Sequence, residues 1–339
     1  MKKLLNALYI TRDGAYLRKE RETILVECDG EKALQLPAHG LSDIHCFGRV
    51  MVSPALMGFC AEQGIGLAFY SEYGRYLASV HGPRMGNVLL RRTQHRRADA
   101  ESDGIAGNIV AAKLANAVTV LRRHQRNHGK VDAVDKAADD IRHLLDDVRH
   151  TKSVTKLRGL EGAAGARYFG VFQNLIRPAV RDGFPFTTRN RRPPRDPVNA
   201  LLSFIYALLT QEISAALHGV GLDPYIGFLH VDRPGRRGLA LDLLEEFRAW
   251  WADRLVLSLI NRQQITPDDF QTEASGAVRL HDEARKRMLV TYQERKRETL
   301  IHPFLKEEIP IGLLPHAQAL LLARHLRGDL AHYPPFSAK

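Results

Sequence analysis

Glu161 is an acidic residue on an otherwise apolar helical stripe. In a helix over 159–176 it precedes Tyr168, Phe172 and Leu175 by 7, 11 and 14 residues, which places all four on one face. A carboxylate on an apolar face is costly to bury unless it is paired, protonated or bound to a metal. The structural alternative is that a glutamate in the first helical turn interacts favourably with the helix dipole. Glu161 is therefore a candidate metal ligand, and its role stays open at this point.

Asp242 and Glu245 repeat this pattern on a helix predicted over 239–261. They lie three residues apart, so their carboxylates point roughly the same way. The neighbouring Glu246 is 100° away from Glu245 around the helix, and we expect it to be a solvated charge facing a lysine or arginine. The opposite stripe is ordinary core, formed by Leu244, Phe247, Trp251 and Leu255. A helix with apolar residues on both faces is largely buried, so two acids on it are a stronger sign of function than one.

His230 ends a short apolar run that is followed by a Pro234-Gly235 turn. A lone histidine in this position is usually a polar residue at the surface, or a core residue whose ring nitrogens have hydrogen-bond partners. Here it precedes Glu245 by 15 residues, and the turn would fold it back toward the acids. Carboxylates with one imidazole suit Mg²⁺ or Mn²⁺ rather than zinc. A divalent ion beside a basic surface is the usual arrangement for phosphodiester chemistry.

The basic surface is indicated by charge. Lys and Arg number 49 against 38 Asp and Glu, a net charge of +11, yet residues 1–85 hold 10 basic and 9 acidic side chains. One arginine cluster lies within 91–97. The other candidate DNA contacts are Arg189, Arg191, Arg192, Arg195, Arg285, Lys286, Arg295 and Lys296. Each cluster could be a solvated face, but together they favour a phosphate-binding surface.

Several other functions lose support. We find no GxxxxGK[ST], no GxGxxG after a strand, no HExxH and no GxSxG, which disfavours nucleotide hydrolysis, dinucleotide redox chemistry and serine hydrolysis. Cys28, Cys46 and Cys60 lack CxxC spacing, which fits buried thiols in a reducing cytosol and not a zinc ribbon. The N-terminal apolar stretch is too short for an export signal, and apolar runs fall short of the ~18–20 residues that span a membrane. We expect a soluble cytoplasmic protein without a membrane partner.

The 339 residues favour two domains. Over 1–85, short β-prone runs are separated by Asp13-Gly14 and Asp29-Gly30 turns, with one helix over 53–63. After residue 85, helical periodicity predicts helices over 107–128, 134–149, 159–176, 197–219, 239–261, 280–297 and 311–327. The sequence therefore predicts an α+β protein with a small N-terminal β-sheet or sandwich domain over 1–85. A larger all-α catalytic and DNA-binding domain would follow over 86–339.

Three segments carry a family resemblance, namely 157–164, 227–230 and 239–248, in this order. They resemble the CRISPR-associated integrase, the universal endonuclease/integrase of spacer acquisition in CRISPR systems. Segments 193–199 and 333–336 are also similar, most closely to the type I-C branch. The likeness covers essentially the whole chain, and the order of the three segments is specific.

The resemblance implies that Glu161, His230 and Glu245 bind a divalent Mg²⁺ or Mn²⁺ ion, with Asp242 as a second acid near the site. It implies metal-assisted transesterification, in which the 3′-hydroxyl of a short DNA fragment attacks a phosphodiester at the repeat edge of a CRISPR array. Water replaces the hydroxyl in the nuclease reaction. The implied partners are double-stranded DNA, a second copy in a homodimer formed through the N-terminal domain, and a small adaptation subunit in a heterohexamer. Arg158, Asn199 and Tyr206 resemble recurrent family positions without an assigned role.

Two alternatives remain at the level of sequence. One is a basic helical scaffold that holds DNA without chemistry, and the other is a metal hydrolase for small phosphate esters. The acids on apolar stripes disfavour the scaffold. The basic clusters and the lack of a small-ligand motif disfavour the hydrolase.

Overall fold

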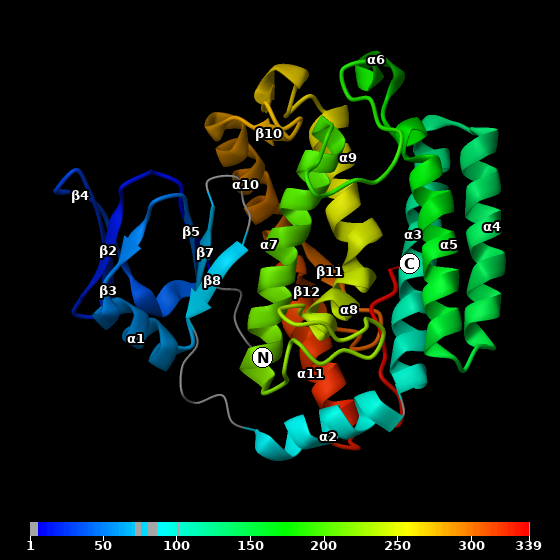
Figure 1. The fold of residues 1–339 in the computed structure, drawn as a ribbon, viewed down its shortest axis with the longest axis horizontal. Helices are drawn as coiled ribbons and strands as arrows, with labels where there is room; N and C mark the ends of the chain where they lie inside the picture. Colours follow the sequence, from blue (N-terminus) through cyan, green and yellow to red (C-terminus); the bar gives the residue numbers. More distant parts are fainter. Residues whose placement is uncertain (1–5, 72–75, 81–86, 101, 339) are drawn as a thin grey trace.

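The structure, a computed structural model, describes residues 6–71, 76–80, 87–100 and 102–338. Strands and one short helix form the N-terminal part, and helices dominate the rest (Figure 1). The predicted α+β class is confirmed. The first of the β-prone runs predicted over 1–85 contains β1 (Asn6–Ile10), and residues 1–5 lie outside the described residues.

Two four-stranded sheets form the N-terminal part. The first has the order β1-β5-β7-β8, in which β1, β5 and β7 run parallel and β8 antiparallel. Its other strands are β5 (Leu41–Phe47), β7 (Gly66–Tyr70) and β8 (Tyr76–Val80). The second has the order β4-β3-β2-β6, formed by β2 (Tyr16–Glu20), β3 (Thr23–Cys28), β4 (Glu31–Pro37) and β6 (Met51–Val52).

The helix predicted over 53–63 is α1 (Pro54–Gln63). The Ser53 side chain accepts a hydrogen bond from the backbone N–H of Leu56, and Gly64 ends the helix in the left-handed conformation. One face of α1 enters the core shared with both sheets. All three cysteines are buried and unpaired, as expected for small core thiols: Cys28, Cys46 and Cys60.

The helical part is built around α7 (Pro197–Val220), which lies beside the helices that follow it (Figure 1). On its far side from the sheets stand α3 (Ser102–His128), α4 (Asp132–Arg149) and α5 (Val154–Gly170), packed against one another. The remaining helices are α2 (Val88–Ala100), α6 (Pro178–Arg181), α8 (Gly238–Phe247), α9 (Arg254–Asn261), α10 (Asp282–Arg297) and α11 (Leu314–Leu326).

The prediction of a helix over 159–176 is wrong at both ends. Ser153 caps α5 by accepting a hydrogen bond from the N–H of Lys156, so the helix begins at Val154. It ends at Gly170, and Phe172–Leu175 forms a separate 3₁₀ turn. Glu161 therefore lies in the middle of α5, and the first-turn dipole explanation does not apply to it.

Two short antiparallel hairpins interrupt the part predicted to be all-α. They pair β9 (Phe270–Thr272) with β10 (Val278–Leu280), and β11 (Thr299–Ile301) with β12 (Glu308–Pro310). Three-residue strands are too short for an alternating pattern to stand out in the sequence. Similarly, the helix predicted over 239–261 contains a π-helical segment, Arg248–Asp253, between α8 and α9.

The first sheet turns its outer face toward the helices. Phe47 stacks on Phe204 of α7 at a ring-centroid distance of 6.0 Å, and Tyr70 stacks on Phe47 at 4.8 Å. Beside this contact, Nζ of Lys296 donates a 2.8 Å hydrogen bond to Oε1 of Glu212. Both charged groups are buried, with side chains 5% and 6% exposed. The prediction of Lys296 as a DNA contact is therefore wrong, because its amine is buried in an ion pair and does not face solvent.

Replacing Lys296 with methionine should lower the free energy of unfolding by about 2–3 kcal/mol, since breaking a buried ion pair leaves Glu212 uncompensated. Burial already raises the pKa of Glu212, against the charge of Lys296, so proton uptake should limit the loss. Urea unfolding measures the effect. The control is Arg297→Met, one residue further on the same helix and exposed. Equal stabilities of the two variants would show that the pair contributes nothing.

Two helices, Gly104–His128 and Pro197–Val220, are long and apolar enough by composition to cross a membrane. In the fold, 56% and 72% of their most apolar windows are buried. Packing inside the helical part accounts for their apolar character.

Candidate metal-dependent active site

Glu161, His230 and Glu245 converge although they come from three separate elements. Glu161 lies on α5, His230 in the loop before α8, and Glu245 on α8. One amine, Nζ of Lys113 on α3, contacts both glutamates, in an ion pair with Glu161 and at 2.6 Å from Oε2 of Glu245. On the other side, Nε2 of His230 lies 3.9 Å from Oε1 of Glu245.

Asp242 stands behind His230 and fixes the loop that carries it. Its carboxylate is fully buried and accepts hydrogen bonds from the backbone N–H groups of Phe228, Leu229 and His230 at 2.6, 3.0 and 3.0 Å. A further 2.6 Å hydrogen bond joins Oδ1 to Nδ1 of His230. With Nδ1 donating to Asp242, Nε2 keeps its lone pair toward Glu245, which is the arrangement typical of a metal-binding histidine.

The loop reaches Asp242 because glycines allow a close approach. A Cβ on Gly227 would lie 2.7 Å from Oδ2 of Asp242, and one on Gly238 would lie 2.7 Å from the carbonyl oxygen of Tyr225. Arg158 holds the loop from α5, since its Nε donates a 2.5 Å hydrogen bond to the carbonyl of Leu229. This contact gives Arg158 a structural role at the site.

Two positively charged side chains act on the carboxylate of Glu245. Burial alone would raise the pKa of its carboxyl, but the positive charges of Arg248 and Lys113 outweigh burial and lower it to about 2. Nη2 of Arg248 lies 3.1 Å from Oε1 of Glu245. Glu245 is therefore ionised throughout the neutral range and available as an oxygen ligand.

The donor types fit a divalent cation. Two carboxylates and one imidazole are present, and the buried Oε2 of Glu245 has the amine of Lys113 2.6 Å away. Within the described part of the chain, no three histidine, cysteine, aspartate or glutamate side chains surround a single point. The amine of Lys113 stands between the carboxylates instead. Sequence reasoning missed Lys113, although it follows the buried Ile109 by four residues on α3 and so lies on a core-facing stripe.

The chain is similar to known proteins over most of its length. The family model described as CRISPR associated protein Cas1 matches residues 8–294. A CRISPR-associated endonuclease Cas1 of Rhodospirillum rubrum is 49% identical over 343 residues, covering 99% of both chains.

The chain belongs to the Cas1 family.

Solved structures agree in fold. A Cas1 protein from Thermotoga maritima has a TM-score of 0.83 and 25% identity, with 98% of this chain and 100% of that chain covered. A chain of a Cas6-RT-Cas1–Cas2 complex has a TM-score of 0.81 and 24% identity, covering 99% of this chain and 36% of that one. The Cas1 architecture thus extends over the whole of the described chain.

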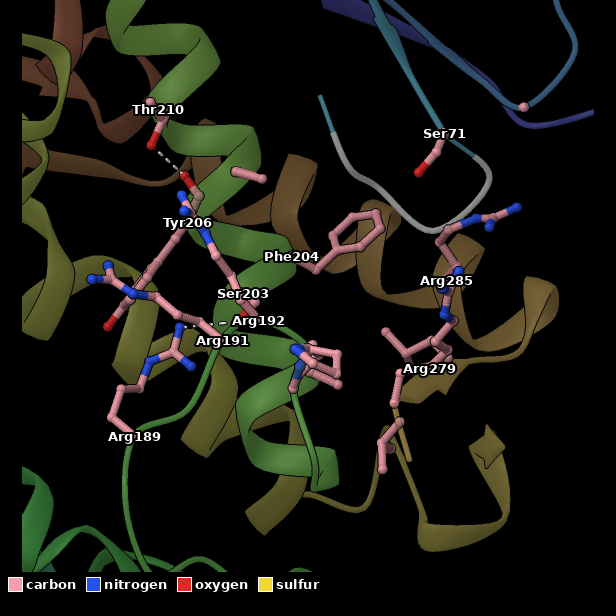
Figure 2. A pocket seen from close by; sticks show the side chains of 18 of the residues that line it. Ser71, Arg189, Arg191, Arg192, Ser203, Phe204, Tyr206, Thr210, Arg279 and Arg285 are labelled. Atoms are coloured by element: carbon pink, nitrogen blue, oxygen red, sulfur yellow. Dashed lines mark hydrogen bonds between the residues drawn. The ribbon is translucent and has the colours of Figure 1, made fainter. Parts of the chain in front are cut away.

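A basic cleft of about 1300 Å³ opens near these residues and is lined by both the N-terminal and the helical part. Arg248, the partner of Glu245, lines it, whereas Glu161, His230 and Glu245 lie outside its lining. Figure 2 shows Arg189 and Arg191 on the side of Tyr206, with Arg279 and Arg285 on the opposite side. Its positive lining residues are Arg49, Arg189, Arg191, Arg192, Arg248, Arg279 and Arg285.

Tyr206 is an aromatic residue of the cleft lining, together with Phe204. Its hydroxyl donates a 2.5 Å hydrogen bond to Oδ1 of Asp253. The guanidinium groups of Arg189 and Arg248 lie 5.3 and 4.9 Å from its ring centre. Asn199 orients Arg189, because its Oδ1 accepts a 2.5 Å hydrogen bond from that guanidinium. The two family-like positions of unassigned role, Asn199 and Tyr206, therefore shape the arginine lining.

The predicted DNA contacts divide into four groups. Arg189, Arg191, Arg192 and Arg285 line the cleft. Lys286 and Arg295 lie on α10 in ion pairs with glutamates of the same segment, Glu283 and Glu298. Arg195 is exposed just outside the cleft lining. Lys296 is buried, as described above.

The prediction that Glu246 is a solvated charge is wrong. Its side chain is fully buried and accepts hydrogen bonds from the Tyr333 hydroxyl at 2.6 Å, the Phe336 N–H at 2.7 Å and the Gln318 amide at 2.9 Å. Its partners lie 72 to 90 residues away, at the end of the chain. A helical wheel does not include them, so the apparent polar face is covered by the tail.

Burial raises the pKa of Glu246 to about 8, despite the three hydrogen bonds that favour ionisation. The folded protein thus holds a proton that the unfolded chain releases above about pH 4.5, and stability falls as pH rises toward 8. Between pH 6 and 9, the wild type should lose about 2–3 kcal/mol relative to Glu246→Gln, which does not titrate. Urea unfolding at both pH values measures this. A constant difference between the two proteins would contradict the shift.

Proposed function

We propose that this protein is a metal-dependent DNA integrase and endonuclease that inserts short DNA fragments into a CRISPR array. The observation that carries the proposal is the convergence of Glu161, His230 and Glu245 beside a cleft lined with arginines. A scaffold that only holds DNA has no need of buried carboxylates, since they repel the phosphate backbone.

In the proposed reaction, Glu161, His230 and Glu245 would hold Mg²⁺ or Mn²⁺, which would polarise the scissile phosphate and stabilise the leaving oxygen. Asp242 keeps Nε2 of His230 turned toward the site through the hydrogen bond to Nδ1. The 3′-hydroxyl of the fragment attacks the phosphorus and the 3′ oxygen of the cut strand leaves, so one phosphodiester replaces another. The arginines of the cleft bind the backbone of the DNA that enters.

We further propose that the protein acts on double-stranded DNA as a homodimer, in a heterohexamer with a small partner subunit. Similarity in fold to a chain from a complex that contains Cas1 and Cas2 supports a Cas2-type partner. We also propose that the protein belongs to the type I-C branch and is located in the cytoplasm.

The test is an integration assay on a supercoiled plasmid that carries a CRISPR repeat, with the purified protein, its small partner and a short labelled duplex. We expect covalent joining of the label to the plasmid only when Mn²⁺ or Mg²⁺ is present. A duplex ending in 3′-dideoxynucleotides is the matched control, because it binds but has no attacking hydroxyl. Joining of the dideoxy duplex would refute attack by the 3′-hydroxyl. Binding of DNA without any joining would refute the reaction and favour a scaffold.

A further inference from the structure

Lys113 occupies a central position among the acids of the site. Its side chain is 15% exposed, and its amine contacts the Glu161 carboxylate and lies 2.6 Å from Oε2 of Glu245. These two glutamates belong to α5 and α8, so one lysine on α3 ties three helices together. Asn116, one turn later on α3, hydrogen-bonds the carbonyl of Glu246 at 2.7 Å and keeps the helices in register.

The charges around Lys113 do not balance. Glu161, Glu245 and Asp242 contribute three negative charges, whereas Lys113 and Arg248 contribute two positive ones. The site thus retains one negative charge, which a divalent cation would convert to one positive charge. A phosphodiester carries one negative charge, so a cation and a phosphate together bring the site to neutrality only if Lys113 is present.

We propose that the amine of Lys113 holds Glu161 and Glu245 together in the metal-free protein. When a divalent ion binds between the two carboxylates, the amine moves out of this space. The flexible four-carbon stem of Lys113 lets the amine withdraw while it stays near the pair. There it would act as a positioning residue that offsets the charge of the scissile phosphate. This inference rests on the proposed function, because it assumes that a metal binds at Glu161 and Glu245.

Removal of Lys113 therefore has two opposite consequences. Lys113→Met should bind Mn²⁺ about tenfold more tightly than the wild type, because a competing charge a few ångströms from the ion is gone. At saturating Mn²⁺ the same variant should join DNA at least about tenfold more slowly, because the phosphate meets one positive charge fewer. A lysine needed only for folding would not raise metal affinity.

The experiment titrates Mn²⁺ into chelator-treated full-length protein and detects free Mn²⁺ by electron paramagnetic resonance. Lys113→Arg keeps the charge and should bind Mn²⁺ within about threefold of wild type. Lys136→Met removes an exposed lysine from α4 and is the control for charge loss elsewhere. Thermal unfolding with and without Mn²⁺ gives a second readout. If Lys113→Met loses stability without metal, its melting temperature should rise more on Mn²⁺ addition than that of wild type.

The outcomes separate the two proposals. Mn²⁺ binding that Glu161→Ala abolishes, and that Lys113→Met tightens, supports the inference. Binding that depends on Glu161 but is unchanged or weaker in Lys113→Met overturns the inference and leaves the metal site intact. Binding indifferent to Glu161→Ala overturns both.

Discussion

Glu161→Ala should reduce DNA strand joining by at least about 10³-fold and change DNA affinity by less than about twofold. A catalytic metal contributes several kcal/mol of transition-state stabilisation, and about 4 kcal/mol corresponds to a thousandfold in rate. Glu161 supplies one of the two carboxylates that could hold the ion, while the arginines of the cleft come from other segments. Binding and chemistry should therefore separate in this variant.

The variant should also fold, because Lys113 keeps its contact with Glu245 when Glu161 is removed. Joining is measured with a labelled duplex and plasmid, and affinity by titration of the same duplex. Glu294→Ala, an exposed glutamate on α10, is the control and should join DNA at the wild-type rate. Wild-type joining by Glu161→Ala would remove Glu161 from the site, whatever its position in the fold.

Phe336→Ala should lower the free energy of unfolding by about 3–5 kcal/mol, the usual loss for a buried phenylalanine. Phe336 is 1% exposed, and its ring lies 5.1 Å from that of Trp250 and 5.7 Å from that of Phe247. Its N–H and carbonyl are bound by Glu246 and by the side-chain amide of Asn116. The tail thus packs directly behind the α8 turn that carries Glu245.

Strand joining should fall with stability in Phe336→Ala, because α3 and α8 lose the contact that holds Lys113 and Glu245 at a fixed separation. Urea unfolding gives the first quantity, and joining at a temperature where the variant stays folded gives the second. Phe304→Ala removes a phenylalanine that is 47% exposed and should change neither. A stable variant with slow joining, or an unstable one with wild-type joining, would show that tail packing and catalysis are not linked.

Helical periodicity singles out Glu161 and Glu245, because both stand on apolar stripes of their helices. The structure brings both carboxylates to the amine of Lys113, and their role as metal ligands stays a prediction. The same method failed for Glu246 and Lys296, which are both buried, although the helix of Glu246 was expected to be largely buried. Their partners are distant in the chain: Phe336 lies 90 residues from Glu246, and Glu212 lies 84 residues from Lys296. Helical periodicity describes one helix, whereas burial depends on everything packed around it.

Lys113 shows a different limit. Like Glu161, it is a charged residue on an apolar stripe. A lysine is not a metal ligand, however, so a search for carboxylate and imidazole ligands does not find it. Asp242 was predicted near the acids, and its place behind His230 depends on Gly227 and Gly238, whose close approach no spacing rule reveals. The short hairpins β9–β10 and β11–β12 were missed for lack of length.

The tail contacts have a consequence for how the protein is made. Asn116 binds Phe336 and Ala338 across separations of 220 and 222 residues. During synthesis, α3, α5 and α8 leave the ribosome long before residues 336 and 338 do. Domains fold as units while the chain elongates at about 5–20 residues per second, so these helices wait at least several seconds for this support. A nascent chain would therefore carry Glu161 and Glu245 before residues 336 and 338 can hold the surrounding helices in place.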